Sequence, residues 1–233
     1  MHSLSNARTV CAYAQRLAAE GLGSAALACA VVGSGVMAER LAGGNAALAL
    51  LCNALATAAV LWVLITTLGP LSGAHLNPVV SLIQLLRRHL TLAQGLAYIG
   101  VQCAAMVLGV WAVHLMFDLP LLQTSTHPRS GAGLWLAEVV ATFGLVATIL
   151  LAAHLRSERL PAMVASYVFA AYWFTASTSF ANPAITLARA LTNTFAGIAP
   201  ADVVGFVLAQ VAGALAGWAV VVFLVRPAAT SSH

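Results

Sequence analysis

Two short motifs place an asparagine directly before a proline inside long apolar stretches: Asn77-Pro78-Val79 and Asn182-Pro183-Ala184. Asparagine is a favoured helix N-cap, and proline suits the first helical position because the N–H that it lacks would have no partner there. Each motif therefore predicts a helix that begins within an apolar region. At membrane depth such a start is tolerated only against protein or beside a water-filled cavity. Two amide groups facing such a cavity could donate hydrogen bonds to the oxygen of a passing uncharged solute.

The composition indicates that the elements around these motifs lie in a membrane. The 233 residues are 61% hydrophobic and only 7% charged, with a mean hydropathy of +0.95. Soluble domains contain about 25% charged residues, so a soluble enzyme and a disordered chain are excluded. The net charge of +4 comes from scattered arginines that form no basic patch, which excludes an ordinary nucleic-acid partner. We expect an all-α membrane protein.

Runs without formal charge predict six spanning helices, because crossing a bilayer takes about 20 residues. We expect the spans at 17–38, 46–68, 91–116, 133–154, 161–178 and 203–225. The uncharged run 41–86 is too long for one span, and it contains Gly69-Pro70 and Asn77-Pro78. We interpret it as one span followed by a re-entrant half-helix from Pro78, with a second half-helix from Pro183. No cleaved signal peptide is expected, because the first apolar segment already has the length of a span.

The arginines predict the orientation of the spans. With a cytoplasmic N-terminus, seven arginines fall on the cytoplasmic side: Arg8, Arg16, Arg87, Arg88, Arg156, Arg159 and Arg226. Only Arg40, Arg129 and Arg189 fall outside, in agreement with the positive-inside bias. This count requires each Asn-Pro segment to enter the membrane and return on the same side. Both termini are then cytoplasmic.

The two halves of the chain share landmarks in the same order, which indicates a repeat. The matched landmarks are Ala19-Glu20 with Ala137-Glu138, the two Asn-Pro motifs, and Tyr98-x3-Gln102-x6-Gly109 with Phe206-x3-Gln210-x6-Gly217. We expect a single channel domain over 1–233, with a first repeat at 17–116 and a second at 133–225. Because each repeat has three spans, the second copy is inverted in the membrane.

The segments Ser72-Gly-Ala-His75-Leu-Asn77-Pro-Val and Ser179-Phe-Ala-Asn182-Pro-Ala resemble the two signature loops of the aquaporin and aquaglyceroporin family. Glu20, Glu138 and Gln102 agree with this resemblance, which covers nearly the whole chain. It implies the aquaporin fold, a homotetramer with one pore in each subunit, and passive flow of small neutral solutes and water. It implies no catalytic residue and no cofactor. The four cysteines, Cys11, Cys29, Cys52 and Cys103, show no metal-binding spacing, so no metal site is expected.

The resemblance also assigns a selectivity filter at Thr57, Ala170, Ser179 and Ile185. Family members usually have arginine directly after the second motif, whereas this chain has Ile185. The missing arginine predicts a wide filter, although a slip in register would bring Phe169, Tyr172 or Trp173 to the pore instead. Arg189 lies one helical turn after Ile185, and it either replaces the missing arginine in the outer vestibule or caps loop carbonyls. Val79 adds bulk beside the asparagines.

Three further polar residues have two interpretations each. Glu20 and Glu138 either accept hydrogen bonds from the re-entrant loops or act as proton relays, and we favour loop support because unpaired loop N–H groups are costly in a membrane. His75 is expected to line the cytoplasmic vestibule, as a gate or as a loop hydrogen-bonding group.

These residues favour a passive channel for glycerol-like polyols, with some water. The run Asn193-Thr-Phe-Ala-Gly-Ile-Ala-Pro200 and the filter without arginine resemble a bacterial branch associated with arsenical-resistance operons. That resemblance implies the bacterial inner membrane, and arsenite or methylated arsenicals as solutes. The alternatives are a water-selective aquaporin, a proton-coupled transporter and a closed junction protein.

Overall fold

The computed structural model describes residues 2–226 and the side chains of residues 12–226. Arg8 and Cys11 therefore lie outside the described side chains. The described part is helical and contains no strand: α1 (His2–Leu41), α2 (Ala46–Ser72), α3 (Pro78–Leu86), α4 (Leu92–Met116), α5 (Ala132–His154), α6 (Leu160–Phe174), α7 (Pro183–Arg189) and α8 (Pro200–Leu224). By length and composition, α2, α4, α5, α8 and the 12–41 part of α1 can cross a membrane, and α6 is a shorter apolar helix. The six predicted long helices and two half-helices are confirmed.

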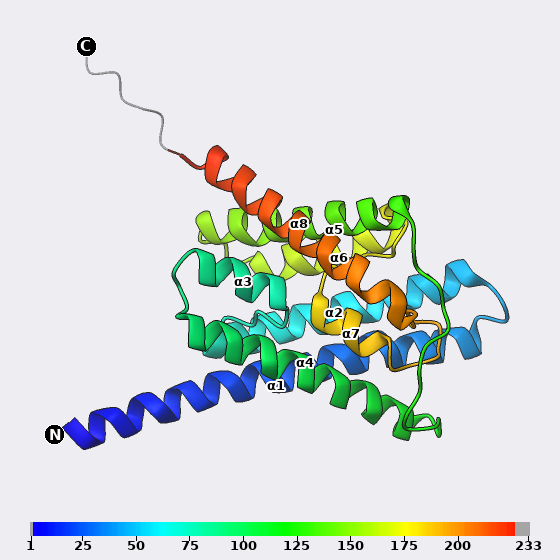
Figure 1. Ribbon diagram of the computed structural model, residues 1–233, viewed down its shortest axis with the longest axis horizontal. Helices are drawn as coiled ribbons and strands as arrows, with labels where there is room; N and C mark the ends of the chain where they lie inside the picture. Colours follow the sequence, from blue (N-terminus) through cyan, green and yellow to red (C-terminus); the bar gives the residue numbers. More distant parts are fainter. Residues whose placement is uncertain (1, 227–233) are drawn as a thin grey trace, which may run out of the picture.

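The helices pack as two similar groups, with the short helices between them (Figure 1). In the first half α1 contacts α2 and α4, and in the second half α5 contacts α6 and α8. The half-helices join the groups, since α3 contacts α4 and α8 while α7 contacts α8 and α4. Each half-helix is thus held between the last long helices of both halves.

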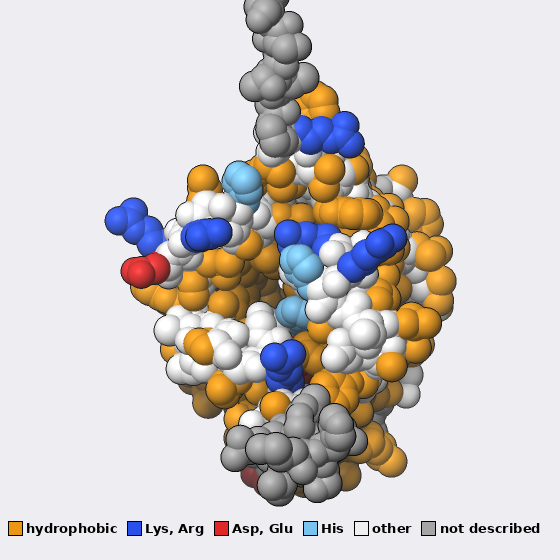
Figure 2. Space-filling model, turned by 90° about the vertical axis from the view of Figure 1, so that its left-hand side faces the viewer, with side chains coloured by type: hydrophobic (Ala, Val, Ile, Leu, Met, Phe, Trp, Pro, Cys, Tyr) orange, Lys and Arg blue, Asp and Glu red, His pale blue; other side chains and the backbone are white. Residues whose placement is uncertain are grey.

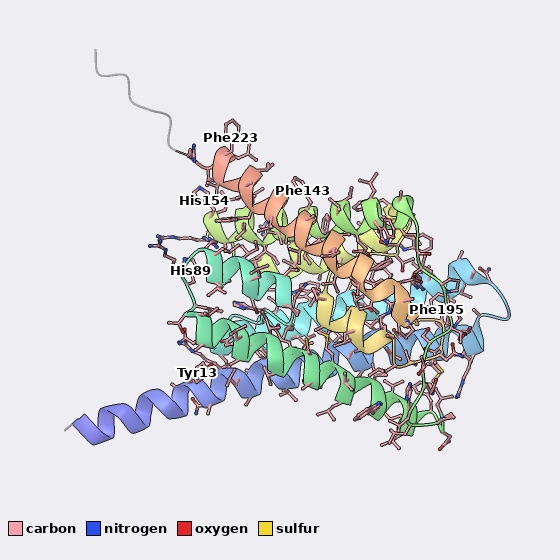
Figure 3. The ribbon with its side chains drawn as sticks, in the orientation of Figure 1. Tyr13, His89, Phe143, His154, Phe195 and Phe223 are labelled. Carbon is pink, nitrogen blue, oxygen red and sulfur yellow. The ribbon has the colours of Figure 1, made fainter. Side chains whose placement is uncertain are left out.

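The ends of the molecule agree with the predicted path of the chain. Tyr13, His89, His154 and Phe223 lie at one end, and Phe195 lies toward the other (Figure 3). We call these the His89 end and the Phe195 end. The half-helix α3 starts near the middle and returns to the His89 end (Figure 1), as a re-entrant segment requires.

Two predicted helix ends are wrong. The helix α2 continues through Gly69 and Pro70 to Ser72 and stops at Gly73, which adopts a left-handed φ of 92° and donates its N–H to Gly69 O. Glycine adopts that conformation without steric cost. The span predicted at 161–178 ends at Phe174, because the chain from Thr175 onward forms the loop that leads to Asn182.

Close packing of the long helices depends on glycine in two equivalent pairs. A Cβ atom on Gly109 of α4 would overlap the carbonyl oxygen of Ala25 in α1. A Cβ atom on Gly217 of α8, the residue that matches Gly109 in the repeat, would overlap the carbonyl oxygen of Phe143 in α5. Only glycine allows backbones this close, so the same device fixes the α1–α4 and α5–α8 interfaces.

Candidate solute pathway

The two Asn-Pro motifs meet through reciprocal hydrogen bonds. Asn77 Nδ2 donates to Ala181 O at 2.8 Å, and Asn182 Nδ2 donates to Leu76 O at 2.8 Å. Each Oδ1 caps its own half-helix, accepting from Val79 N at 3.1 Å and from Ala184 N at 3.0 Å. An amide nitrogen carries two hydrogens, so each asparagine keeps one donor for another oxygen.

The loops before the asparagines share an unusual backbone conformation. Leu76 and Ala181, directly before each asparagine, have φ of 49° and 48°. Ala74 and Ser179, three residues before, have φ of 44° and 49°. Left-handed backbone at residues other than glycine costs free energy and persists only where the surroundings impose it. These loops therefore need support from outside themselves.

Glu20 supplies that support in the first half. Its Oε1 accepts hydrogen bonds from Ser72 Oγ at 2.7 Å and from His75 N at 2.9 Å. Its Oε2 accepts from Leu76 N at 2.8 Å and from Gln102 Nε2 at 2.8 Å. The carboxylate is fully buried, and its partners lie at the end of α2, in the loop that follows and in the helix α4.

Glu138 makes the equivalent contacts in the second half. It accepts from Phe180 N at 2.9 Å, from Ala181 N at 2.9 Å and from Gln210 Nε2 at 2.6 Å. Gln210 also donates to Thr186 Oγ1 at 2.9 Å, as Gln102 does to Ser81 Oγ at 3.0 Å. The same set of hydrogen bonds thus positions both asparagines.

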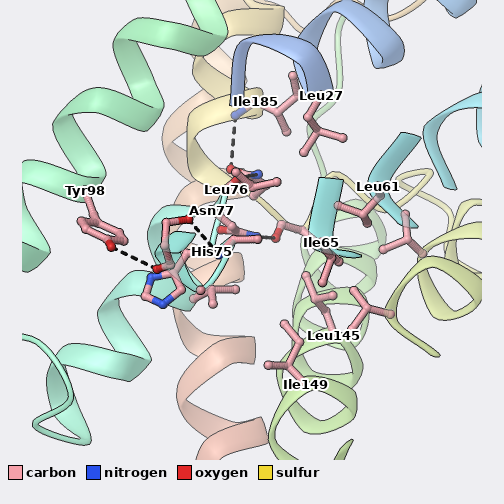
Figure 4. A pocket seen from close by; sticks show the side chains of 18 of the residues that line it. Leu27, Leu61, Ile65, His75, Leu76, Asn77, Tyr98, Leu145, Ile149 and Ile185 are labelled. Carbon is pink, nitrogen blue, oxygen red and sulfur yellow. Dashed lines mark hydrogen bonds between the residues drawn. The ribbon is translucent and has the colours of Figure 1, made fainter. Parts of the chain in front are cut away.

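A cavity of about 490 Å³ runs past the two asparagines. Its walls are apolar stripes in which every fourth residue of a helix faces inward: Leu27 and Val31 of α1, Leu61 and Ile65 of α2, Leu145 and Ile149 of α5, and Leu160, Val164 and Val168 of α6. Figure 4 shows Leu61, Ile65, Leu145 and Ile149 opposite the loop that carries His75, Leu76 and Asn77. Only the asparagine of each motif lines the cavity. Val79 is buried in an apolar cluster instead, so the expectation that it adds bulk beside the asparagines is wrong.

The His89 end of the cavity is basic. Arg16, His75 and His89 line it, and Figure 2 shows arginine and histidine side chains around a hollow at this end of the molecule. The His75 Nδ1 atom lies 3.0 Å from Ser81 Oγ, and its ring lies 5.1 Å from the Tyr98 ring. His75 therefore both lines the vestibule and contacts α3 and α4.

The filter prediction needs one correction. Thr57, Ser179 and Ile185 are buried and line the cavity. Ala170 is exposed and lies outside the lining, so its assignment to the filter is wrong. Two residues along a helix point to nearly opposite sides, and it is Tyr172 that lines the cavity, with its hydroxyl 3.4 Å from Thr57 Oγ1.

Arg189 is the last residue of α7 and lies on the cavity wall toward the Phe195 end of the molecule. It lines the cavity and is only 3% exposed. Its Nε donates to Ala196 O, and its guanidinium carbon lies 3.4 Å from the centroid of the Phe180 ring. Both interpretations of Arg189 thus have a contact in the structure, since it caps a loop carbonyl and still faces the cavity.

Arg129 lies in the segment that joins the two halves. Like Arg189, it contacts the loop after α7 and the Phe180 ring. Its Nε donates to Gly197 O at 2.8 Å, and its guanidinium carbon lies 5.1 Å from the Phe180 ring centroid. Burial lowers the pKa of Arg129, and attraction to Glu138 opposes that change. His114 fixes the neighbouring loop, with Nε2 lying 2.9 Å from Thr192 Oγ1.

Sequence reasoning missed the residues that complete these networks. Ser81 and Thr186 occupy the same place in the two Asn-Pro segments, and that repeat position was the signal that could have revealed their shared contacts. Tyr172 was not missed but was predicted only as an alternative to Ala170. It continues the stripe Leu160, Val164 and Val168 at the same spacing, and that spacing could have selected it.

The arrangement suits the passage of a small neutral solute. The described part of the lining holds amide, hydroxyl, imidazole and guanidinium groups but no carboxylate. No group of three or more potential metal ligands occurs among the described residues, and Cys29, Cys52 and Cys103 are free thiols that do not line the cavity.

Comparisons with known proteins agree with this geometry. The family described as "Major intrinsic protein" matches residues 7–175. Aquaglyceroporin AqpS of Rhizobium meliloti (strain 1021) is 52% identical over 214 residues, which cover 92% of this chain and 91% of that protein. Probable aquaporin TIP1-1 of Oryza sativa subsp. japonica is 34% identical over 122 residues, or 50% of this chain and 48% of that protein.

The X-ray structure of the aquaglyceroporin from Plasmodium falciparum has a TM-score of 0.70 at 19% identity and covers 91% of this chain and 95% of its own. This likeness confirms the predicted aquaporin fold. The family excludes an enzyme, because aquaglyceroporins of this family are channels. The chain belongs to the major intrinsic protein family.

Proposed function

We propose that this protein is a passive channel for small uncharged solutes, chiefly glycerol-like polyols, with some water. The observation that carries the proposal is the pair of asparagine amides, each tied by one hydrogen bond to the opposite loop and lining a cavity with apolar walls. Each amide then has one hydrogen available for the oxygen of a solute. The aquaglyceroporin relative from Rhizobium meliloti, at 52% identity, supports the polyol class.

Ions are excluded because the walls cannot replace their hydration. The stripes on α1, α2, α5 and α6 offer only aliphatic carbon, and moving a charge into such surroundings costs several kcal/mol or more. A cation also meets Arg16 at one end and Arg189 at the other. A polyol can present carbon to the stripes and oxygen to Asn77 and Asn182.

The pore accepts solutes larger than water because Ile185 stands where family members usually carry arginine. Thr57, Ser179 and Ile185 are small or aliphatic, and all three line the cavity. Arg189 orients oxygen-rich solutes from one helical turn further along. Trihydroxylated arsenite resembles glycerol in size and in its hydroxyl groups, and it belongs to the proposed solute range together with methylated arsenicals.

Glu20 and Glu138 support the loops and relay no protons. Neither carboxylate lines the cavity, and every contact of Glu138 is a donor from the loop or from Gln210. A proton-coupled transporter needs a titratable group that the solute pathway can reach. The two fully buried carboxylates favour a passive channel over that alternative.

The proposed setting is the bacterial inner membrane, with both termini cytoplasmic and a homotetramer of four separate pores. Large apolar side chains cover the outer sides of the long helices, among them Leu55, Trp62, Leu108, Leu208 and Phe223. Such faces suit lipid and neighbouring subunits. The two sets of loop contacts also support the proposed repeats at 17–116 and 133–225.

The test is a light-scattering assay on liposomes that contain the purified protein, after mixing with a glycerol solution. Shrinkage faster than in empty liposomes, followed by protein-dependent reswelling, is expected for a pore that passes water and glycerol. Fast shrinkage without reswelling would instead mean a water-selective pore. Flux that collapses with a protonophore would contradict passive transport. Arsenite and methylated arsenicals are tested next by their uptake into the same liposomes.

A further inference from the structure

The loop between α7 and α8 carries the run Asn193-Thr-Phe-Ala-Gly-Ile-Ala-Pro200. Backbone hydrogen bonds tie this loop to the segment that joins the two halves of the chain, between α4 and α5. Ser125 N donates to Ala190 O at 2.9 Å, and Ala199 N donates to His127 O at 2.7 Å. The loop and the joining segment therefore lie side by side.

Two neighbouring carbonyl groups of this loop each accept from an arginine. Arg189 Nε donates to Ala196 O, and Arg129 Nε donates to Gly197 O at 2.8 Å. Glycine is required at position 197, because a Cβ atom there would overlap the backbone oxygen of Thr192. The compact loop thus brings an arginine of α7 and an arginine of the joining segment to consecutive residues.

The same two arginines also share one aromatic ring. The guanidinium carbon of Arg189 lies 3.4 Å from the centroid of the Phe180 ring, and that of Arg129 lies 5.1 Å from it. Both distances are within the range of cation–π attraction. The ring itself is fixed, because Phe180 N donates to Glu138 at 2.9 Å and the ring packs edge-on against Phe206 at 5.1 Å.

The two arginines differ in what they face. Arg189 is buried and lines the cavity, whereas Arg129 does not line it. The described contacts of the Arg189 guanidinium are a carbonyl oxygen and an aromatic ring rather than a carboxylate. A charge held in this way takes its direction from the loop and from the ring. Both of these are also contacts of Arg129.

We propose that Arg129 is a positioning residue that holds Arg189 in its direction toward the cavity and thereby sets the preference of the pore for polyols over water. Removing Arg129 frees Gly197 O and one contact of the Phe180 ring, and the guanidinium group of Arg189 loses its fixed direction. This inference rests on the proposed channel function and on the orienting role of Arg189.

The proposal is tested with Arg129→Ala and Arg189→Ala, alone and together, in the liposome assay. The readout is the ratio of glycerol to water permeability, which a general loss of folded protein does not change. Arg129→Ala is expected to lower this ratio about two- to fivefold, the effect of losing a cation–π contact. In the Arg189→Ala background it is expected to have no further effect, because it acts through Arg189.

Three results would overturn the positioning role. They are an unchanged ratio in Arg129→Ala, an unchanged ratio in Arg189→Ala, and an equal fall from Arg129→Ala in both backgrounds. The last result would mean that Arg129 acts on the solute independently of Arg189.

Arg40→Ala is the matched control, because Arg40 makes the same two kinds of contact elsewhere. Its Nη2 donates to Phe117 O at 3.0 Å, and its guanidinium carbon lies 5.1 Å from the centroid of the Phe117 ring. Arg40 does not line the cavity, and its removal is expected to leave the ratio unchanged. A fall equal to that of Arg129→Ala would show a general effect of losing an arginine and would refute the proposal.

Phe180→Leu tests the same link if Arg129→Ala does not fold. It removes the ring that both arginines contact and keeps the backbone N–H that donates to Glu138. It is expected to lower the ratio as Arg129→Ala does, and an unchanged ratio would overturn the link. If the wild type passes glycerol and the variants keep its ratio, only this inference fails. If the wild type does not exceed empty liposomes, the channel function fails as well.

Discussion

Replacing Glu138 by glutamine removes one hydrogen-bond acceptor from the loop that carries Asn182. The Glu138 carboxylate accepts from Phe180 N and Ala181 N, both at 2.9 Å, and from Gln210 Nε2 at 2.6 Å. A glutamine amide has one oxygen and one NH₂ group. The amide oxygen of glutamine can replace Oε2 and accept from Ala181 N and Gln210 Nε2. Its NH₂ group then takes the place of Oε1 and faces the N–H of Phe180, which is also a donor.

The free-energy cost of this substitution follows from the burial of Glu138. Glu138 has no exposed surface, so the Phe180 N–H that loses its acceptor cannot turn to water. An unsatisfied buried donor costs about 1–3 kcal/mol. In a protein of this length, that loss lowers the melting temperature by about 2–12 °C. The left-handed residues Ser179 and Ala181 then lose part of their support, and we expect glycerol permeability to fall because Asn182 is displaced.

The assay combines thermal unfolding in detergent with glycerol reswelling of liposomes. Glu158→Gln is the matched control, because Glu158 is exposed and lies outside the cavity lining; it is expected to unfold and conduct as the wild type does. A Glu138→Gln protein with unchanged stability and unchanged flux would refute the loop-support argument. Loss of flux with full stability would instead favour a proton relay.

Three further predictions concern single residues. Arg189→Ala is expected to lower the ratio of glycerol to water permeability and Arg189→Lys to keep more of it; equal ratios in all three proteins would exclude an orienting role. Gly109→Ala is expected to lose about 1–3 kcal/mol of stability, because the added carbon overlaps Ala25 O. Gly100→Ala, which meets nothing within 4 Å, is expected to be neutral or slightly stabilising in the same thermal unfolding assay. Ser179→Cys is expected to make glycerol flux sensitive to mercuric ion, because Ser179 lines the cavity and no described cysteine does; mercury block equal to that of the wild type would contradict its place in the lining.

Local sequence rules predicted the elements because the responsible interactions are local. Asn77 and Asn182 cap the half-helices that follow them, and Pro78 and Pro183 begin them. Long apolar runs predicted the spans because bilayer thickness sets their length. The C-terminal ends of α2 and α6 were predicted wrongly, because hydropathy carries no information on where the backbone dihedral angles change. Gly73, with φ of 92°, ends α2 by its conformation rather than by its polarity.

The filter residue on α6 could not be obtained by counting from Asn182. Ala170 and Tyr172 differ by two positions, and on a helix this difference decides which side chain faces the cavity. The rotation of α6 depends on its packing against α2 and α5, and Glu138 holds the loop that follows α6 through Phe180 and Ala181. Such contacts join residues far apart in the chain.

The sequence by itself determined the membrane class, the two Asn-Pro half-helices and the repeated order of landmarks, because composition and capping act within a few residues. Only the tertiary structure decided which side chains share the cavity. It paired Tyr172 with Thr57, brought Arg189 against Phe180 and placed the Val79 side chain in an apolar cluster away from the cavity. The physical reason is that these choices depend on how each helix is rotated against its neighbours, and packing across the whole molecule sets that rotation.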